Sequence, residues 1–151
     1  MDRSDLYIIV AGCGRLGARL ASELSRTGSS VVVIDRDPSR FAGLTAEFSG
    51  FHLTGDAIEQ EVLRSAKIEQ ADCFLATTNQ DNINLMLAQV AKVIYGVPLV
   101  MARIYDPLRS PVYERLGIDT ISPTELSAQE FLRMITARAG LEPASALRNG
   151  R

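Results

Sequence analysis

The chain contains 151 residues, of which 46% are hydrophobic and 23% charged, and it carries a formal net charge of −2. This length and composition predict one globular domain, and the slightly acidic balance argues against a nucleic-acid partner, because such proteins usually carry a basic surface. No apolar stretch approaches the roughly 20 residues of a membrane span and the first residues lack the apolar core of a secretory signal, so we expect a cytoplasmic protein with free thiols at Cys13 and Cys73.

The first predicted unit is a strand, a glycine-rich turn, a helix and a second strand. Residues 6–10 form an unbroken apolar run, which is typical of a strand covered on both faces. The helix that follows has leucines at positions 16, 20 and 24 on one face and is expected to end at Gly28. The second strand is expected over residues 31–34.

The turn carries the pattern G-x-G-x-x-G at Gly12, Gly14 and Gly17. The first glycine permits a tight turn, the second lets a phosphate approach the backbone, and the third allows the helix to pack closely on the sheet. The free N–H groups at the helix start form an anion site. Asp35 follows Gly14 by 21 residues (35 − 14), at the end of the second strand, where an acid commonly bonds a ribose hydroxyl. Glycines serving backbone geometry alone would leave this acid unexplained, so the unit predicts nucleotide binding.

Strands and helices continue to alternate along the rest of the chain. Asp37 and Pro38 predict the start of a helix, and an apolar stripe at positions 41, 44 and 48 extends it towards Gly50. The other expected strands cover residues 51–54, 73–76, 99–102 and 118–121, and the other expected helices cover residues 58–66, 83–94, 111–117 and 122–135. Residues 141–151 lack apolar periodicity and are predicted to be a tail or linker.

This alternation predicts an α/β fold: a Rossmann-like, doubly wound parallel sheet of six strands in the order 3-2-1-4-5-6, in one domain over residues 1–140. Ligands of such sheets bind beyond the carboxyl ends of the strands. The polar residues expected to converge there are Asp35, Asp56, Thr77, Thr78, Asn79 and Arg103. The only histidine, His52, is expected to be structural or surface-exposed, and the scattered carboxylates to be solvated or capping, so no catalytic or metal-binding residue is predicted.

Six motifs spread over the chain support a family resemblance. They are GCGRLG at 12–17, VVVIDRDP at 31–38, GDA at 55–57, TTNQDNIN at 77–84, ARIYDP at 102–107 and GIDTISPTEL at 117–126. Together they resemble the N-terminal nucleotide-binding domain (TrkA-N type) of potassium-conductance regulators, the cytosolic ring-forming subunits of Trk/Ktr-type potassium uptake systems. The resemblance covers roughly residues 7–140.

The resemblance implies a binding site for an adenine nucleotide: NAD, NADH, ATP, ADP or AMP. The residues that would hold the phosphates are Gly12, Cys13, Gly14, Arg15, Leu16 and Gly17. Asp35 would bond the ribose hydroxyls, and its charge should disfavour the 2′-phosphate of NADP, although Arg36 tempers this repulsion. Within the glycine loop, Arg15 can reach a diphosphate or triphosphate bidentately.

The resemblance also implies roles for residues after the other strands. Arg36 would stack on the adenine, or it is a solvated surface charge. The adenine edge would be bordered by Asp56 and Ala57. The far side would be lined by Thr77, Thr78 and Asn79, of which the last two could equally cap the following helix. Arg103 would face the phosphates from the dimer interface.

The partners implied by the resemblance are a membrane potassium transporter subunit, which nucleotide binding would gate, and further copies of the chain in a dimer or ring. The protein would then work in the cytoplasm, at the inner face of the membrane. The apolar surfaces of residues 108–116 and 126–135 are candidate oligomer contacts, although part of each is expected to complete the monomer's own sheet. Family members usually carry a second, smaller ligand-binding domain after the final helix. The chain has no room for one, and we expect a truncated chain or a short form whose second half is a separate subunit.

One motif departs from the family, and other functions stay open. Many relatives place a metal-binding Glu after the proline of the sixth-strand motif, where this chain has Thr124 followed by Glu125. A shift of one position turns a helical side chain by about 100°, so we predict no metal site. The alternatives are a small NAD-dependent oxidoreductase, or its cofactor-binding half, and a structural ring subunit without nucleotide affinity. For the enzyme, the chain lacks a Tyr-x-x-x-Lys pair and a credible His–carboxylate pair.

Overall fold

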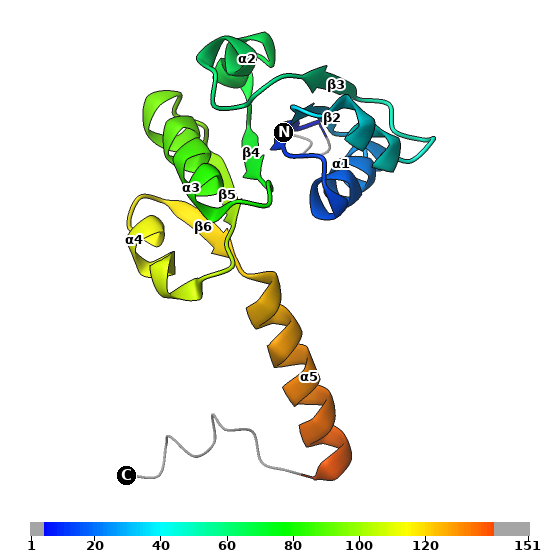
Figure 1. Ribbon diagram of the computed structural model, residues 1–151, viewed down its shortest axis with the longest axis vertical. Helices are drawn as coiled ribbons and strands as arrows, with labels where there is room; N and C mark the ends of the chain where they lie inside the picture. The colour runs from blue at the N-terminus through cyan, green and yellow to red at the C-terminus, as the bar shows by residue number, and fades with distance from the viewer. Residues whose placement is uncertain (1–4, 141–151) are drawn as a thin grey trace.

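The computed structural model describes residues 5–140. Its six parallel strands form a sheet in the order β3-β2-β1-β4-β5-β6, which confirms the predicted Rossmann-like arrangement (Figure 1). The strands are β1 (Tyr7–Ala11), β2 (Ser30–Asp35), β3 (Phe51–Thr54), β4 (Cys73–Ala76), β5 (Leu99–Arg103) and β6 (Ile118–Ile121). The predicted tail, residues 141–151, lies outside the described residues, and the domain boundary at residue 140 stays a prediction.

The sheet is covered on both faces, as the unbroken apolar run in β1 predicted. Successive side chains of a strand point to opposite faces, so Ile9 packs in one apolar cluster and Ile8 in the other. Both are buried, and burial of such side chains stabilises the fold by about 1.5–3 kcal/mol each. The α-helices are α1 (Arg15–Arg26), α2 (Gln60–Ser65), α3 (Asp81–Gln89), α4 (Ser110–Glu114) and α5 (Pro123–Ala139). The Ile9 cluster contains side chains of α2 and α3, and the Ile8 cluster contains side chains of α1.

The register of the central strands brings their carboxyl ends to one edge of the sheet. Ala11 of β1 pairs with Ile34 of β2 and with Ala76 of β4, and Ala76 pairs with Ala102 of β5. The loops that follow these residues therefore start at the same level. This alignment creates the crevice that the strand order predicted.

The segment after β2 differs from the predicted helix. It is a short 3-10 helix, η1 (Pro38–Gly43), and the backbone is already extended at Leu44, with ψ at 142°. The predicted start is confirmed, because Asp37 accepts a hydrogen bond from the N–H of Ser39. The three aromatic and aliphatic side chains of the predicted stripe are partly buried against the Ile8 cluster. The stripe therefore indicated burial, but the segment packs as a short 3-10 helix followed by extended backbone and not as an α-helix up to Gly50.

Three other short helical segments refine the predicted element boundaries. The predicted helix over 83–94 is α3 followed by a π-helical segment, η3 (Val90–Ile94). A 3-10 turn, η2 (Ile68–Gln70), follows α2, and another, η4 (Pro107–Arg109), precedes α4. The two 3-10 turns were not predicted, because short turns carry too few residues for a periodic signal.

The last helix, α5, runs from the end of β6 away from the sheet (Figure 1), and none of its residues is buried. Its apolar side chains are largely exposed, with Phe131 at 71% and Leu132 at 64%. The expectation that part of each of the last two helices completes the monomer's sheet is confirmed for α4, whose Tyr113 packs against the Ile9 cluster. It is wrong for α5, whose apolar face has no partner among the described residues. Over residues 5–140, every helix is too short or too polar to cross a lipid bilayer.

Candidate functional site

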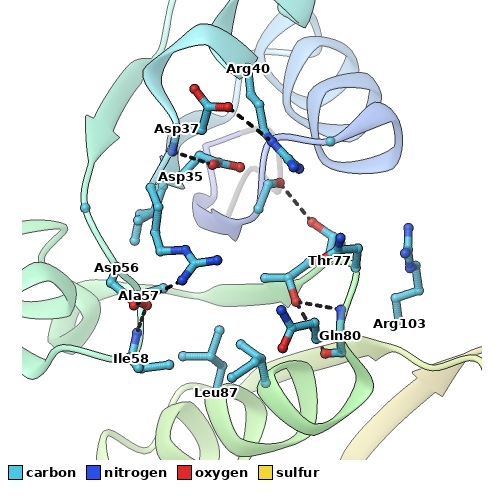
Figure 2. Close-up of a pocket in the computed structure, with 18 of the residues that line it drawn as sticks. Asp35, Asp37, Arg40, Asp56, Ala57, Ile58, Thr77, Gln80, Leu87 and Arg103 are labelled. Atoms are coloured by element: carbon cyan, nitrogen blue, oxygen red, sulfur yellow. Dashed lines mark hydrogen bonds and ion pairs between the residues drawn. The ribbon is translucent and has the colours of Figure 1, made fainter.

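A cavity of about 450 Å³ opens at the carboxyl ends of the central strands, where the crevice was predicted (Figure 2). Eleven of the fourteen predicted site residues line it: Gly12, Gly14, Arg15, Asp35, Arg36, Asp56, Ala57, Thr77, Thr78, Asn79 and Arg103. The other three, Cys13, Leu16 and Gly17, do not line it. The cavity thus brings the predicted residues together, while the contact of each with a ligand stays a prediction.

Two glycines, Gly12 in the loop after β1 and Gly17 in the first turn of α1, are required by the fold itself. Gly12 has a φ of +105°, and a Cβ there would lie 2.9 Å from the backbone nitrogen of Thr78. A Cβ on Gly17 would lie 1.8 Å from the carbonyl oxygen of Gly12. Gly17 therefore permits the predicted close packing of α1, from behind the cavity wall.

Gly14 differs, because its open side faces the cavity. A Cβ there would meet only Nη1 of Arg40, at 3.9 Å. Gly14 is the N-cap of α1, no side chain caps this helix start, and no acidic residue lies in its first turn. The first N–H groups of α1 thus lack a side-chain partner and carry the positive end of the helix dipole. This end of the cavity is suited to an anion.

Asp35 lies at the end of β2 and is hydrogen-bonded to two backbone amides. Its Oδ2 accepts the N–H of Cys13 at 2.8 Å, and its Oδ1 accepts the N–H of Asp37 at 2.8 Å. Each carboxylate oxygen has about two acceptor positions, so one on each remains for a ligand hydroxyl. Burial, together with the charge of Asp35, raises the pKa of Cys13 to about 11, so this thiol within the glycine loop stays neutral.

Two predicted residues face each other across one side of the cavity: Arg36, directly after β2, and Asp56, after β3. Nη1 of Arg36 lies 3.9 Å from Oδ2 of Asp56, and the Arg36 side chain is 72% exposed. Oδ1 of Asp56 accepts the N–H of Ile58 at 3.1 Å, which fixes the turn that carries the buried Ala57. Arg36 is therefore a loosely paired surface charge in this structure, at the rim of the cavity.

The opposite side is organised by Asn84, which the sequence analysis did not select. Asn84 is fully buried in α3, and its Oδ1 accepts both the N–H and the hydroxyl of Thr78, at 2.9 and 2.6 Å. Its Nδ2 donates to the carbonyl oxygens of Thr78, at 3.0 Å, and Arg103, at 2.9 Å. The loops after β4 and β5 are thereby joined. Thr78 also bonds the backbone of Gln80, the N-cap of α3, but no described side chain caps this helix, so the capping alternative for Thr78 and Asn79 is wrong.

Thr77 and Arg103 complete the lining on this side (Figure 2). The Thr77 hydroxyl is buried and donates to the carbonyl oxygens of Ala11 and Gly12, at 3.2 and 3.1 Å. Arg103 contacts the hydroxyl of Tyr105 and stands 4.7 Å from the centre of its ring. Its Nε is buried without a hydrogen-bond partner among the described residues. A buried guanidinium nitrogen without a partner costs free energy, which a ligand acceptor could offset.

The other eight lining residues were not predicted as site residues: Ile34, Asp37, Arg40, Gly55, Ile58, Gln80, Ile83 and Leu87. Ile83 and Leu87 are four positions apart on α3, and their helical periodicity was interpreted only as a core signal. The sequence predicts Arg40 within an α-helix after Pro38, and that prediction does not indicate that its side chain faces the cavity. The missed residues add apolar surface and one more cation to the cavity.

His52 lies exposed on β3, stacked on Phe41 with a ring-centre separation of 4.5 Å, and it does not line the cavity. The expectation of a structural or surface histidine is confirmed. Over the described part of the chain, no three metal-ligating side chains are grouped together.

The chain is similar to a known family of domains and to longer proteins that contain them. The model of the TrkA-N domain matches residues 8–123. The Trk system potassium uptake protein TrkA of Streptomyces coelicolor is 44% identical over 138 residues, which make up 91% of this chain and 61% of that protein. The chain therefore spans about three fifths of the length of this relative.

Two solved structures share the fold. The Kef CTD of Shewanella denitrificans, in an AMP-bound form, superposes with a TM-score of 0.71 over 93% of this chain and 85% of that chain, at 24% identity. GsuK bound to ADP superposes with a TM-score of 0.74 over 91% of this chain and 35% of that chain, also at 24% identity. At this level of identity the likeness concerns the fold.

Proposed function

The chain belongs to the TrkA-N domain family, and we propose that it is the nucleotide-binding regulatory domain of a potassium uptake system. An adenine nucleotide would bind in the cavity at the carboxyl ends of the strands and change the domain's contacts with its partners. Of the two solved structures that share the fold, one is in an AMP-bound form and one is bound to ADP, which supports this class of ligand.

The observation that carries the proposal is the uncapped start of α1 beside an unshielded Gly14. The N–H groups there have no side-chain partner, and backbone amides with a helix dipole bind phosphate well. Arg15 and Arg103 line the same cavity, so cationic side chains flank the proposed phosphate position. A capping side chain at position 14 would accept hydrogen bonds from these N–H groups and leave none for a phosphate.

The remaining walls suit the adenosine. Asp35 keeps acceptor positions for the ribose hydroxyls, and its charge opposes a 2′-phosphate. Ala57, Ile58, Ile83 and Leu87 supply apolar surface for a base. NAD(H), ATP, ADP and AMP all contain an adenine base and its ribose, so we propose that the site recognises this shared adenosine group.

Regulation requires that ligand binding favours one arrangement of an assembly over another. We propose that the partners are a membrane potassium transporter subunit and further copies of this chain, and that the domain works at the cytoplasmic face of the membrane. The exposed apolar side chains of α5 support an oligomer contact. A second ligand-binding unit, which the longer relative has room for, would be a further partner or a continuation of the chain.

The proposal is tested by thermal unfolding and calorimetry of the full chain with NAD, NADH, ATP, ADP, AMP and NADP. A ligand at 100 times its dissociation constant stabilises a protein by about 2.7 kcal/mol, which is easily measured. We expect stabilisation by adenine nucleotides, weaker binding of NADP, and no oxidation of NADH with carbonyl substrates. Absence of binding by all these ligands would favour a structural subunit, and NADH turnover would favour an oxidoreductase.

A further inference from the structure

Arg40 stands over the glycine loop, although nothing in the sequence pattern pointed to it. Its Nη1 lies 3.9 Å from the position that a Cβ on Gly14 would occupy. Figure 2 shows its guanidinium directed into the cavity, near Asp35. The side chain is therefore beside the open face of the loop where the proposed phosphate would lie.

The short helix η1 fixes the backbone of Arg40 next to this loop. The Cys13 thiol donates to the carbonyl oxygen of Arg40 at 3.5 Å, and Asp37 caps the turn through Ser39. A second hollow of about 590 Å³, between α1 and η1, also has Gly14, Arg15 and Arg40 in its wall. The Arg40 side chain thus stands where the two hollows meet, with open space in which to move.

The guanidinium is only loosely held. Its Nε lies 3.9 Å from Oδ2 of Asp37, and both side chains are about half exposed, at 47% and 54%. Asp37 makes shorter bonds to Ser39, at 3.0 Å to its N–H and 2.6 Å to its hydroxyl. These bonds lower the pKa of Asp37, so the carboxylate stays charged, but they engage its Oδ1 elsewhere. A long exposed ion pair of this kind contributes little to stability.

We propose that Arg40 is a phosphate-binding residue of the nucleotide site, released from Asp37 when the phosphorylated end of the ligand enters. A phosphate oxygen offers a guanidinium short, bidentate bonds that the distant Asp37 does not, because the planar fork matches a tetrahedral anion. Asp37 is then a competitor for Arg40. This inference rests on the proposed nucleotide-binding function and adds a residue and a mode of competition to it.

The test compares adenosine, AMP and ADP by calorimetry on the full chain, with the variants Arg40→Gln, Asp37→Asn and the double variant. We expect Arg40→Gln to weaken AMP and ADP about 10-fold and to leave adenosine unchanged, because only the phosphorylated ligands reach the guanidinium. Asp37→Asn should strengthen AMP and ADP about 2- to 5-fold, since asparagine keeps the cap but frees Arg40. In the double variant this gain should vanish.

The matched control is Arg19→Gln, an exposed arginine that lines only the second hollow, and it should bind all three ligands like the wild type. Unfolding without ligand reports whether each variant folds, and Asp37→Asn tests the competition independently of any damage from losing Arg40. Equal AMP affinity in wild type and Arg40→Gln, or an equal loss of adenosine, would overturn the inference alone. A wild type that binds none of the three ligands would overturn the proposed function, and the inference with it.

Discussion

Oδ2 of Asp35 accepts the backbone N–H of Cys13 at 2.8 Å, so the carboxylate at the end of β2 fastens the glycine loop that follows β1. The residue proposed to hold the ribose therefore also shapes the loop proposed to hold the phosphates. A single substitution at Asp35 should disturb both, and the two effects can be separated with a suitable control.

We predict that Asp35→Ala weakens all adenine nucleotides alike, by about 10-fold or more, because they share the ribose. The free energy of unfolding without ligand should also fall, by about 1–3 kcal/mol, since the Cys13 N–H loses its acceptor. Asp72→Ala is the control: Asp72 accepts the N–H of Tyr7 at 2.8 Å but does not line the cavity. It should lower stability without changing affinity. Full nucleotide affinity in Asp35→Ala, measured by calorimetry, would show that the ribose is held elsewhere.

The same charge should control the reactivity of Cys13. Burial and then Asp35 raise the pKa of this thiol to about 11, so at pH 8 only about one molecule in a thousand carries the thiolate, which is the form that attacks an alkylating reagent. The rate of alkylation should rise about tenfold per pH unit up to this pKa. Asp35→Asn should lower the pKa and accelerate alkylation of Cys13. The internal control is Cys73, whose pKa is also raised to about 11, by burial and then by Asp72 instead of Asp35. Mass spectrometry of the two cysteines gives the rate ratio, and an unchanged ratio would contradict the prediction.

The sequence was sufficient for the sheet because β1, β2, β4 and β5 each contain a continuous apolar run, and β3 and β6 followed from the alternation of strands with helices. The glycine spacing with Asp35 located the cavity. It failed where burial and periodicity diverge. The apolar spacing at Phe41 and Leu44 fits an α-helix and also fits a short irregular segment that packs on the core. The sequence therefore predicted neither η1 nor the position of the Arg40 side chain at the cavity. Asn84 was missed for the opposite reason: a polar residue within an apolar helix pattern gives no sign that four hydrogen bonds from neighbouring loops meet on it.

Gly14, the N-cap of α1, and Gly17, in its first turn, should respond oppositely to alanine. Gly17→Ala places a Cβ 1.8 Å from the carbonyl oxygen of Gly12, so α1 must shift, and we expect a loss of stability of about 3 kcal/mol or more. Gly14 has a φ of −73° and space around it, so Gly14→Ala should fold with a loss within about 1 kcal/mol. Its methyl group would occupy the approach of the phosphate, and AMP affinity should fall at least about 10-fold. Urea unfolding and calorimetry measure the two effects, and a Gly14→Ala protein with wild-type affinity would contradict the proposed phosphate position.

The buried Asn84 should be irreplaceable even by aspartate. Asn84→Asp keeps the acceptor for Thr78 but leaves the carbonyl oxygens of Thr78 and Arg103 facing a buried carboxylate instead of a donor. We expect a loss of about 3 kcal/mol or more in the free energy of unfolding. Asn82→Asp is the control, because Asn82 is exposed and its Oδ1 accepts a bond from Arg109 that an aspartate also accepts. Its effect should stay within about 0.5 kcal/mol. Urea unfolding of both variants decides, and equal stability would mean that the loops after β4 and β5 are held by other contacts.

The exposed apolar face of α5 should hold copies of the chain together. Phe131 and Leu132 are 71% and 64% exposed and do not support the monomer's core, so Phe131→Asp should leave the fold intact. In a twofold symmetric contact the substitution removes two Phe131 side chains, one from each copy. Since burying each is worth about 1.5–3 kcal/mol, the dissociation constant should rise about 100-fold or more.

Light scattering after size-exclusion chromatography, over a range of protein concentrations, measures the mass of the assembly. Gln129→Ala, an exposed polar position on the same helix, should assemble like the wild type. A wild type that stays monomeric at high concentration, or a Phe131→Asp variant of unchanged mass, would rule out this contact between copies. The exposed face would then have to serve a different partner.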